Sequence, residues 1–222
     1  LNISAKGNIK KMYASLYLKK KCNAVSGNGL YKDSLQEGRC VYRGINPNNY
    51  ITFNNEKSGW RIISVESDGT LKIMRATSIG DMAWDTSNSN KWERPATLNT
   101  YLNSTYYNNL NESSRKQIQM KTWDIGPYDE VQTLPEVLQM EKSESWTGNI
   151  GLMTLSDIYN SSSNMAQCGD PKGYGDNLEQ VHQGLCSSSS YIYTIVATSS
   201  RNMTWLLTST AIDCVWHTYG DK

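Results

Sequence analysis

The chain has 222 residues, a formal net charge of +1 and 38% hydrophobic residues, which suits one large domain or two small ones. Near-neutrality argues against a nucleic-acid-binding domain, which is normally basic, and small net charge with patterned apolar runs argues against disorder. Tyr and Trp number 14 and 7 against a single Phe, which suits both a thin core and a contact surface. Abundant Asn, Ser and Thr with 19% charged residues indicate a loop-rich extracellular domain.

The first part of the chain predicts a helix followed by short strands. Residues 3–21 repeat apolar side chains at helical spacing, with lysines on the other side. Residues 22–40 contain turn signals and predict a loop. Short strands are expected at 40–44 and 50–53, separated by the turn at 46–49.

A β-hairpin is the strongest local prediction. Its strands run from Trp60 to Val65 and from Leu71 to Arg75, with β-branched residues in both. Asp68-Gly69 between them supplies the positive φ angles that a tight turn requires. Apolar residues occur on both faces, so we expect this hairpin to be covered on both sides, near the centre of the sheet.

Three helices are expected after the hairpin, at 97–110, 112–119 and 155–159. Thr154 or Ser156 suits the cap of the last helix, and an acid follows in its first turn.

The remaining segments predict loops and strands. Residues 121–149 hold scattered acids and prolines and predict an irregular excursion, and 150–154 a strand that leads into the last helix. A Ser/Gly/Asn-rich loop is expected at 160–190, and final strands at 205–209 and 213–218.

The five cysteines predict two local disulfides. Cys22 with Cys40 and Cys168 with Cys186 have equal spacing, and no Cys-x-x-Cys pair exists. Each bridge would close a polar loop that lacks a core of its own, and oxidised pairs imply export. Cys214 is left either for a partner outside this chain or as a small buried residue.

Nothing in the sequence is long and apolar enough to predict a membrane span. The chain starts at Leu1 without Met, so we expect a piece of a longer product from which targeting or anchoring segments have been removed.

The order of several short motifs resembles a known family. The most specific pair is Asn46-Pro47-Asn48-Asn49-Tyr50 with Trp60-Arg61-Ile62-Ile63. The others are Gly29-Leu30-Tyr31, Tyr42-Arg43-Gly44, Ser78-Ile79-Gly80, Leu98-Asn99-Thr100-Tyr101-Leu102-Asn103, Ile150-Gly151-Leu152-Met153-Thr154-Leu155-Ser156-Asp157 and Trp205-Leu206-Leu207-Thr208-Ser209.

Over residues 29 to 217 the chain is similar to an uncharacterised family of surface proteins from gut-dwelling Gram-positive bacteria. Some of these have a single membrane-spanning or pilin-like helix at the N-terminus. Their domain resembles the C-type-lectin-like superfamily that includes the sulfatase-modifying factors. The family's final hairpin, with its Val-Arg-Pro-Val-Leu-like segment, does not appear before Lys222.

The resemblance implies an α+β fold of C-type-lectin-like type, a twisted antiparallel sheet with two or three helices and long loops. Residues 1–28 would form an amphipathic helix and connector, and 29–222 a domain cut short at its C-terminus.

No catalytic residue is predicted. Sulfatase-modifying factors use reactive cysteines near the C-terminus, and Cys214 is the only candidate for that role. His217, three positions on, would lie on the opposite face of a strand. The other histidine is His182, and no Gly-x-Ser-x-Gly elbow occurs.

No metal site and no cofactor are predicted. Cys168, His182 and Cys186, with Asp170 and Asp176 between them, have a spacing that a Zn²⁺ site could use. The preferred interpretation is the disulfide with an exposed histidine. The Glu-Pro-Asn, Gln-Pro-Asp and Trp-Asn-Asp segments of calcium-dependent lectins are missing.

Aromatic residues crowd the middle of the chain and are candidates either for binding or for the core. Half-exposed aromatic rings stack on sugars and anchor protein contacts, but they also fill a thin core. The candidates for binding are Trp84, Trp92, Trp123 and Trp146. Asn-x-Ser/Thr sequons begin at Asn2, Asn103, Asn111, Asn160 and Asn202, and in a bacterial protein they are accidents of composition.

The expected function is adhesion or ligand binding at the bacterial cell surface, without catalysis. Its partner would be a host or cell-surface protein or a glycan. The alternative is the structural ectodomain of a type IV pilin-like subunit, which would contact sister subunits of a filament. An enzyme related to the sulfatase-modifying factors is the weaker third hypothesis.

Overall fold

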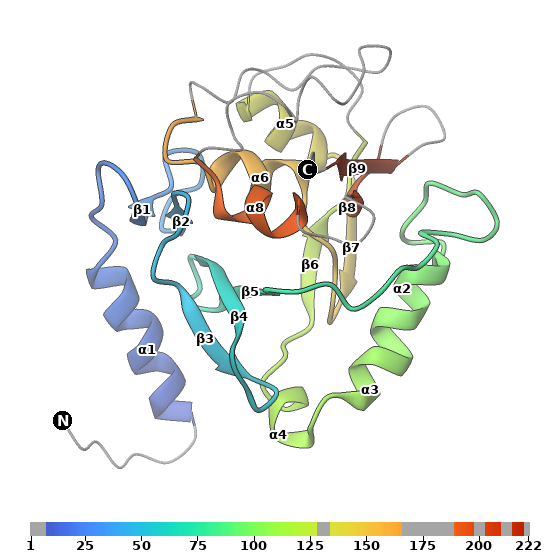
Figure 1. Ribbon diagram of the computed structural model, residues 1–222, viewed down its shortest axis with the longest axis horizontal. Coiled ribbons are helices and arrows are strands. Elements are labelled where there is room, and N and C mark those ends of the chain that lie inside the picture. The colour runs from blue at the N-terminus through green and yellow to red at the C-terminus, as the bar shows by residue number, and fades with distance from the viewer. Residues whose placement is uncertain (1–7, 128–133, 166–188, 198–202, 210–214, 220–222) are drawn as a thin grey trace.

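The computed structural model describes residues 8–127, 134–165, 189–197, 203–209 and 215–219 (Figure 1). Its helices are α1 (Asn8–Lys20), α2 (Thr97–Tyr101), the π-helical η1 (Leu102–Tyr106), α3 (Tyr107–Asn109), α4 (Glu112–Arg115), α5 (Leu134–Glu141), α6 (Leu155–Asn160) and α8 (Tyr191–Ala197). Its strands are β1 (Gly29–Lys32), β2 (Cys40–Arg43), β3 (Tyr50–Phe53), β4 (Glu56–Val65), β5 (Leu71–Arg75), β6 (Lys121–Asp124), β7 (Ser145–Gly148), β8 (Met203–Ser209) and β9 (Val215–Tyr219). The strands pair antiparallel and the helices are short, so the α+β class is confirmed.

The main sheet is organised around β4. Strand β5 pairs with one edge of β4, and β2 and β3 share the other edge. Asn49 fills the gap between β2 and β3. Its backbone carbonyl accepts from the Ile62 amide at 2.8 Å, and its side-chain amide donates to the Ile62 carbonyl at 2.7 Å. All six residues from Trp60 to Val65 are buried, as expected of a strand covered on both faces. The expectation is wrong for β5, whose five residues are all half-buried.

Tight turns join the strands on both sides of β4. Gly69 has a φ of 85° in the β4–β5 turn, so the predicted hairpin is confirmed. The β3–β4 turn places Asn54 and Asn55 at φ 54° and 61°, a conformation that asparagine tolerates better than most residues.

The predicted helices form with changed lengths. Residues 97–109 are helical throughout, through α2, η1 and α3, as expected. Helix α4 ends at Arg115 instead of continuing to 119. Thr154 caps α6 in a capping box, because its hydroxyl accepts from the Asp157 amide and the Asp157 carboxylate accepts from the Thr154 amide.

Other predictions for the middle of the chain are wrong. Residues 121–149 contain the β6–β7 pair and α5, where an irregular excursion was expected. In β6–β7, Trp123 lies opposite Trp146 and forms a cross-strand pair. Each strand has only four residues, which is too short for a periodic pattern to be recognised in the sequence. The loop expected at 22–40 contains β1, which pairs with β2, and residues 151–154 form no strand.

Two hydrophobic clusters fill the interior of the part of the chain that the structure describes. The sheet cluster lies between the main sheet, α6 and α8, and includes Ile63, Leu155 and Ile192. The tryptophan cluster lies around α2 and includes Trp84 and Trp92. In Figure 1 the main sheet and α2 stand on opposite sides of β6 and β7.

Helix α1 lies along one side of the molecule (Figure 1). The Lys19 ammonium donates to the Ser67 carbonyl at 2.7 Å, and Leu18 packs on the sheet cluster. The Cys22–Cys40 disulfide joins the residues after α1 to β2, which confirms the first predicted pairing.

Candidate functional site

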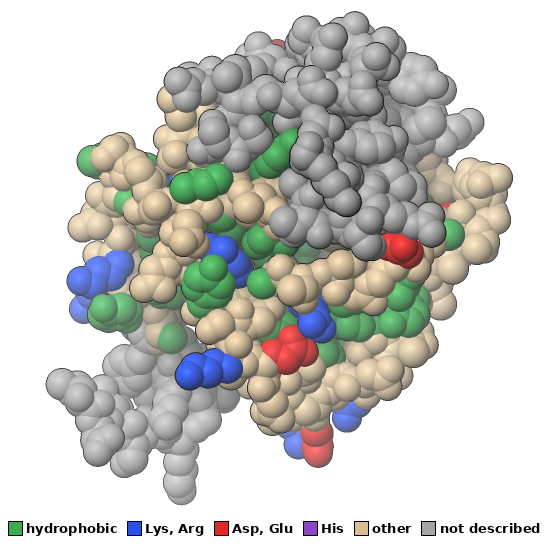
Figure 2. Space-filling model, viewed as in Figure 1, with side chains coloured by type: hydrophobic (Ala, Val, Ile, Leu, Met, Phe, Trp, Pro, Cys, Tyr) green, Lys and Arg blue, Asp and Glu red, His purple; other side chains and the backbone are tan. Residues whose placement is uncertain are grey.

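A groove of about 360 Å³ lies between the two hydrophobic clusters. One wall comes from β4, β5 and residues 76–80, and the other from α2, η1, Trp123 and residues 150–153. In Figure 2 hydrophobic side chains gather across the middle of the molecule, with basic and acidic side chains beside them. The volume is in the range of small-molecule sites, which are mostly apolar with a few polar groups.

The lining is aromatic and rich in methionine. Trp60, Trp123 and Tyr106 contribute rings, and Met74, Met82 and Met153 are three of the chain's eight methionines. Unbranched thioether side chains adapt to irregular shapes and are common at surfaces that accept varied ligands. The groove is therefore suited to an apolar ligand body.

The π-helical turn η1 shapes the second wall, where Leu102 and Tyr106 face the groove. The Asn103 side chain joins this turn to residues 149 and 150 of the same chain. Its Oδ1 accepts from the backbone amides of Asn149 and Ile150 at 3.2 and 3.1 Å, and its Nδ2 donates to the Ile150 carbonyl at 2.9 Å. Single π-helical turns are frequent at functional sites.

The charged residues that line the groove are both basic. Lys72 donates to the Asp157 carboxylate at 2.6 Å, and its ammonium lies 5.4 Å from the Trp123 ring centroid. Arg75 makes long contacts of 3.4 and 3.3 Å with Glu56. Asp157 and Glu56 stand outside the lining, and no described lining residue is acidic.

Arg75 and Tyr106 leave hydrogen-bonding capacity unused. Arg75 and the Tyr106 hydroxyl interact with each other, but Arg75 Nε and Tyr106 Oη are shielded from water and lack a partner with regular hydrogen-bond geometry among the described residues. Burial raises the pKa of Tyr106, while the neighbouring Arg75 lowers it less, so the phenol keeps its proton at neutral pH. The groove thus contains two donors without regular acceptors.

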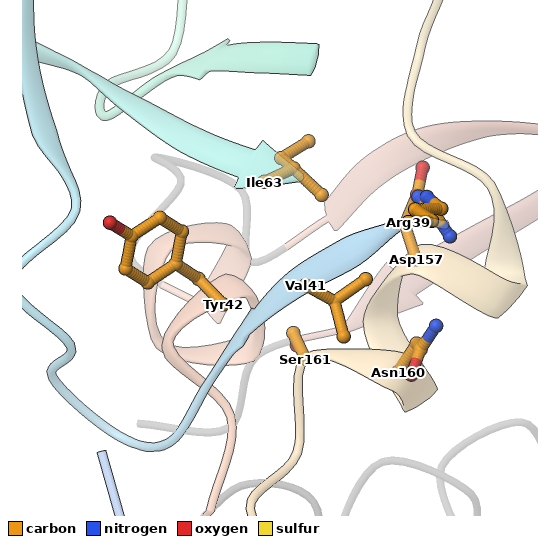
Figure 3. Close-up of a pocket in the computed structure, with 7 residues that line it drawn as sticks. All are labelled: Arg39, Val41, Tyr42, Ile63, Asp157, Asn160 and Ser161. Carbon is orange, nitrogen blue, oxygen red and sulfur yellow. The ribbon is translucent and has the colours of Figure 1, made fainter. Parts of the chain in front are cut away.

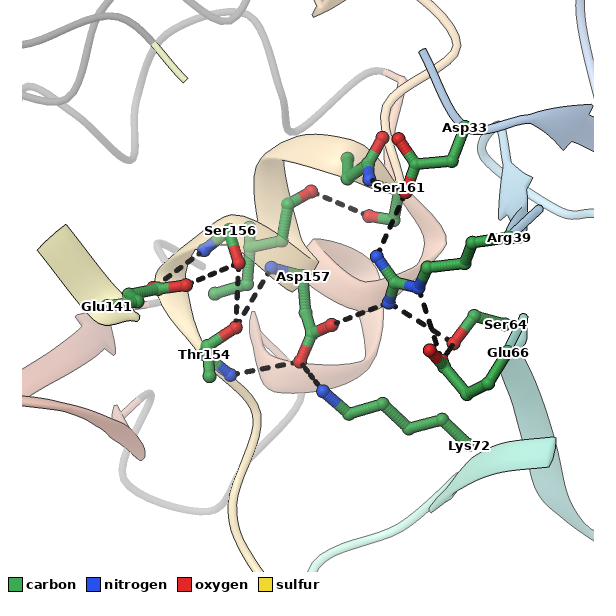
Figure 4. A network of polar contacts seen from close by, with 12 residues as sticks. Asp33, Arg39, Ser64, Glu66, Lys72, Glu141, Thr154, Ser156, Asp157 and Ser161 are labelled. Carbon is green, nitrogen blue, oxygen red and sulfur yellow. Dashed lines mark hydrogen bonds and ion pairs between the residues drawn. The ribbon is translucent and has the colours of Figure 1, made fainter. Parts of the chain in front are cut away.

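A buried polar network lies behind Lys72 (Figure 4). Arg39 contacts Asp33 at 3.0 Å, Glu66 at 3.2 Å and Asp157 at 3.6 Å. Burial by itself would raise the pKa of Asp157, but Lys72 and Arg39 outweigh it and hold that pKa below its usual value. The network holds the Lys72 head group in the groove lining, beside the Trp123 ring.

The space beside this network admits no ligand. Figure 3 shows the hollow between β2 and α6, lined by residues such as Val41, Tyr42 and Asn160. Its free volume is about 0 Å³ even for water. Two serine hydroxyls lie 2.5 Å from carboxylates, Ser64 from Glu66 and Ser156 from Glu141, but both serines are buried. These pairs are therefore structural.

The two motifs that carry the resemblance form one packing unit. Arg61 donates through Nε to Asn49 Oδ1 at 2.6 Å and through Nη2 to the Pro47 carbonyl at 2.9 Å. Its guanidinium lies 4.2 Å from the ring centroid of Tyr50 and 4.6 Å from that of Tyr191. The joint occurrence of both motifs thus has a structural reason.

The four tryptophans predicted to bind are brought together, but as parts of the tryptophan cluster and not as a shared binding surface. Trp84 and Trp92 are 3% and 2% exposed, which agrees with the core alternative and removes them from the accessible surface. Trp146 is half-buried and packs edge-on against Trp92, with ring centroids 5.8 Å apart. Only Trp123 of the four lines the groove.

The groove residues Arg75 and Tyr106 were missed by the sequence analysis. An arginine at the end of an amphipathic strand and a tyrosine in a helix are ordinary in sequence, and only the packing of η1 against β5 brings them together. The cluster of half-buried methionines was an available but weak signal.

Several residues singled out in the sequence lie outside the part of the chain that the structure describes. Cys168, His182, Cys186 and Cys214 fall in segments that the structure does not describe, as does the side chain of His217. Within the described residues, no three His, Cys, Asp or Glu side chains are arranged to hold a metal ion.

Three of the sequons have structural roles. Asn103 and Asn111 form side-chain hydrogen bonds. Asn160 is buried, and its side-chain amide donates a hydrogen bond to the Asp33 carboxylate at 3.1 Å. A glycan on these nitrogens would break those bonds.

No family model, no curated protein and no solved structure matches this chain. None of the helices in the described residues has the length and apolar character that crossing a membrane requires.

Proposed function

We propose that this chain is a non-catalytic domain of an exported bacterial surface protein and that it binds a ligand in the groove between its two hydrophobic clusters. The observation that carries the proposal is the groove itself, about 360 Å³ with aromatic and methionine walls. A core that had closed completely would leave no such space, because interiors pack to near-crystalline density.

The Cys22–Cys40 disulfide supports the exported location, since such bonds persist in oxidising compartments. The C-type-lectin-like architecture, the resemblance to Gram-positive surface proteins and the adhesive role belong to the same proposal. They rest on the motif order described above.

Indole NMR signals test the groove directly. Titration with neutral 1-naphthylmethanol should shift the indole N–H signals of Trp60 and Trp123, which line the groove. The signals of Trp84 and Trp92, which are buried in the tryptophan cluster outside the lining, serve as internal controls.

Matched variants complete this experiment. Leu152→Trp adds bulk to the wall and should abolish the shifts, whereas Met120→Trp adds the same ring at a 65% exposed position and should preserve them. Equal shifts in all tryptophans, or none at any probe concentration, would contradict a binding groove.

The pilin-like alternative has one observation in its favour. Helix α1 packs along the body with Leu16 and Tyr17 47% and 61% exposed, so part of its surface is open to another subunit. Sedimentation of the chain alongside Leu16→Glu and Tyr17→Glu variants tests this. Association that those charges abolish would favour the subunit, and a monomer at high concentration would count against it.

A further inference from the structure

The charged side chains of the described groove lining are all positive. Lys72 and Arg75 face it from β5, and their acidic partners Asp157 and Glu56 lie outside the lining. Among the described lining residues, a ligand in the groove therefore meets two cations and no carboxylate, which favours an anionic group over a cationic one.

The two cations differ in how firmly they are held. Lys72 has a short contact of 2.6 Å with a nearly inaccessible carboxylate. Arg75 reaches Glu56 at 3.3–3.4 Å and the Thr77 hydroxyl at 3.4 Å, and its guanidinium lies 5.7 Å from the Trp60 ring centroid. These contacts are all longer than the one at Lys72, and the Arg75 side chain is 29% exposed. Glu56 also accepts hydrogen bonds from Trp60 and Asn54, so it keeps partners when Arg75 turns away. Arg75 is thus the cation available to a ligand.

Tyr106 provides a second donor next to Arg75. Its hydroxyl interacts with Arg75, and it and Arg75 Nε are the two water-shielded groups of the described lining without a hydrogen bond of regular geometry. A carboxylate has two acceptor oxygens, and arginine with a phenol can satisfy both. Because Tyr106 and Arg75 are half-buried as whole side chains, small rotations turn both donors toward a bound acceptor.

The rest of the groove selects the body of the ligand. Trp60 and Trp123 offer ring surface, and Met74, Leu152 and Met153 are apolar. Aromatic rings gain from stacking against such walls, and methionines adapt to differing outlines.

We infer that the groove takes a compact amphipathic carboxylate, with an aromatic or short hydrocarbon body between the tryptophans and its carboxylate on Arg75 and Tyr106. This inference rests on the proposed function, since it names the ligand class of the same groove.

A pair of matched probes tests the head group. 1-Naphthylacetate and 1-naphthylacetamide share one body and differ in charge, and calorimetry at pH 7 gives the Kd of each. The acid should bind about tenfold more tightly or better, as expected for hydrogen bonds to a charged group. Tyr106→Phe should reduce that ratio several-fold, and Arg75→Gln should bring it close to one.

Control variants separate charge from fold. Arg94→Gln removes an exposed arginine outside the lining and should keep the ratio. Arg75→Lys keeps the charge without the planar fork and should give an intermediate ratio. The indole NMR spectrum of each variant reports folding, and Tyr106→Phe remains a valid test if Arg75→Gln fails to fold.

The outcomes distinguish the two proposals. Equal affinity for acid and amide in the parent protein overturns the carboxylate inference and leaves the groove as a binding site. Preserved discrimination in the folded Arg75→Gln protein places the head group elsewhere and also overturns it. If neither the two probes nor 1-naphthylmethanol binds, the proposed function fails as well.

Discussion

Arg61 is 5% exposed and has no carboxylate partner among the described residues. Its charge is stabilised by oxygen atoms of Asn49 and Pro47 and by the faces of Tyr50 and Tyr191. Burial lowers the pKa of Arg61, although an arginine starts so high that it stays charged. A planar guanidinium fits between two rings while donating at its edges, and lysine lacks that geometry.

Arg61→Lys should therefore destabilise the protein by about 2–4 kcal/mol, because buried acceptors and both ring contacts lose their partner. Urea unfolding followed by tryptophan fluorescence measures the change. Arg94→Lys, at an exposed position, is the control and should stay within about 0.5 kcal/mol of the parent. Similar midpoints for both variants would show that the Arg61 cluster contributes little.

Asp157 is the second residue on which the interior depends. It accepts from Lys72 and the Thr154 amide and lies 3.6 Å from Arg39. Asp157→Asn leaves two cations short of a carboxylate and should cost about 3–5 kcal/mol, the usual result of breaking a buried ion pair. Thermal unfolding checks this against Glu93→Gln, an exposed carboxylate.

The same residue predicts acid sensitivity. The folded-state pKa of Asp157 is lower than its unfolded value of about 3.9, so its stabilisation is complete above that pH and is lost as the pH falls through the lower folded value. Urea midpoints at successive pH values below about 5 should fall more steeply in the parent than in Asp157→Asn. Parallel curves would assign the acid response to other groups.

At the scale of elements, the β4–β5 hairpin and the helix over 97–109 follow from sequence, because their periodicity is long and their turn chemistry is distinctive. Strands β6 and β7 do not, since four residues are too few for a pattern and their pairing depends on the tryptophan cluster. The groove escapes sequence analysis for a related reason. It exists where two separately packed clusters meet, and residues distant in sequence supply its polar end.

The β4–β5 turn gives a prediction for one element. Gly69 has a φ of 85°, and a Cβ there would lie 3.3 Å from the Ser15 hydroxyl of α1. Gly69→Val should cost about 1–3 kcal/mol, because a β-branched residue is strained at positive φ. Gly27→Val is a useful comparison. Gly27 has φ 65° with open space around its Cβ, so it reports the backbone strain without the contact to α1.

Hydrogen exchange tests the central place of the same hairpin. Amides of Ile62, Ile63, Leu71 and Ile73 should exchange among the slowest, since β4 has neighbours on both edges. Fast exchange at these positions, with slow exchange in β6 and β7, would place the most stable part of the protein in the tryptophan cluster.

At the scale of the whole molecule, only 38% of the residues are hydrophobic, and the described core is divided between two clusters. A covalent cross-link therefore adds stability that such a core does not supply alone. The Cys22–Cys40 bond closes 18 positions of sequence that contain the polar loop between α1 and β2. It also holds α1 against the sheet, where Lys19 donates to the Ser67 carbonyl in the β4–β5 turn.

Replacing both Cys22 and Cys40 with serine should lower the unfolding free energy by about 3 kcal/mol, the loop-closure expectation for a loop of this size. The half-cystines are 4% and 6% exposed, so each serine also buries a hydroxyl in the sheet cluster and adds to the cost. Adding a reductant to the parent protein separates the two effects, because it opens the bond without changing the residues.

Peptide mapping under non-reducing conditions should find this bridge, and it also tests the Cys168–Cys186 pairing that remains a prediction. Free thiols at Cys22 and Cys40 in protein purified from its native host would remove the covalent tie of α1 to the sheet and, with it, the main support for an exported location.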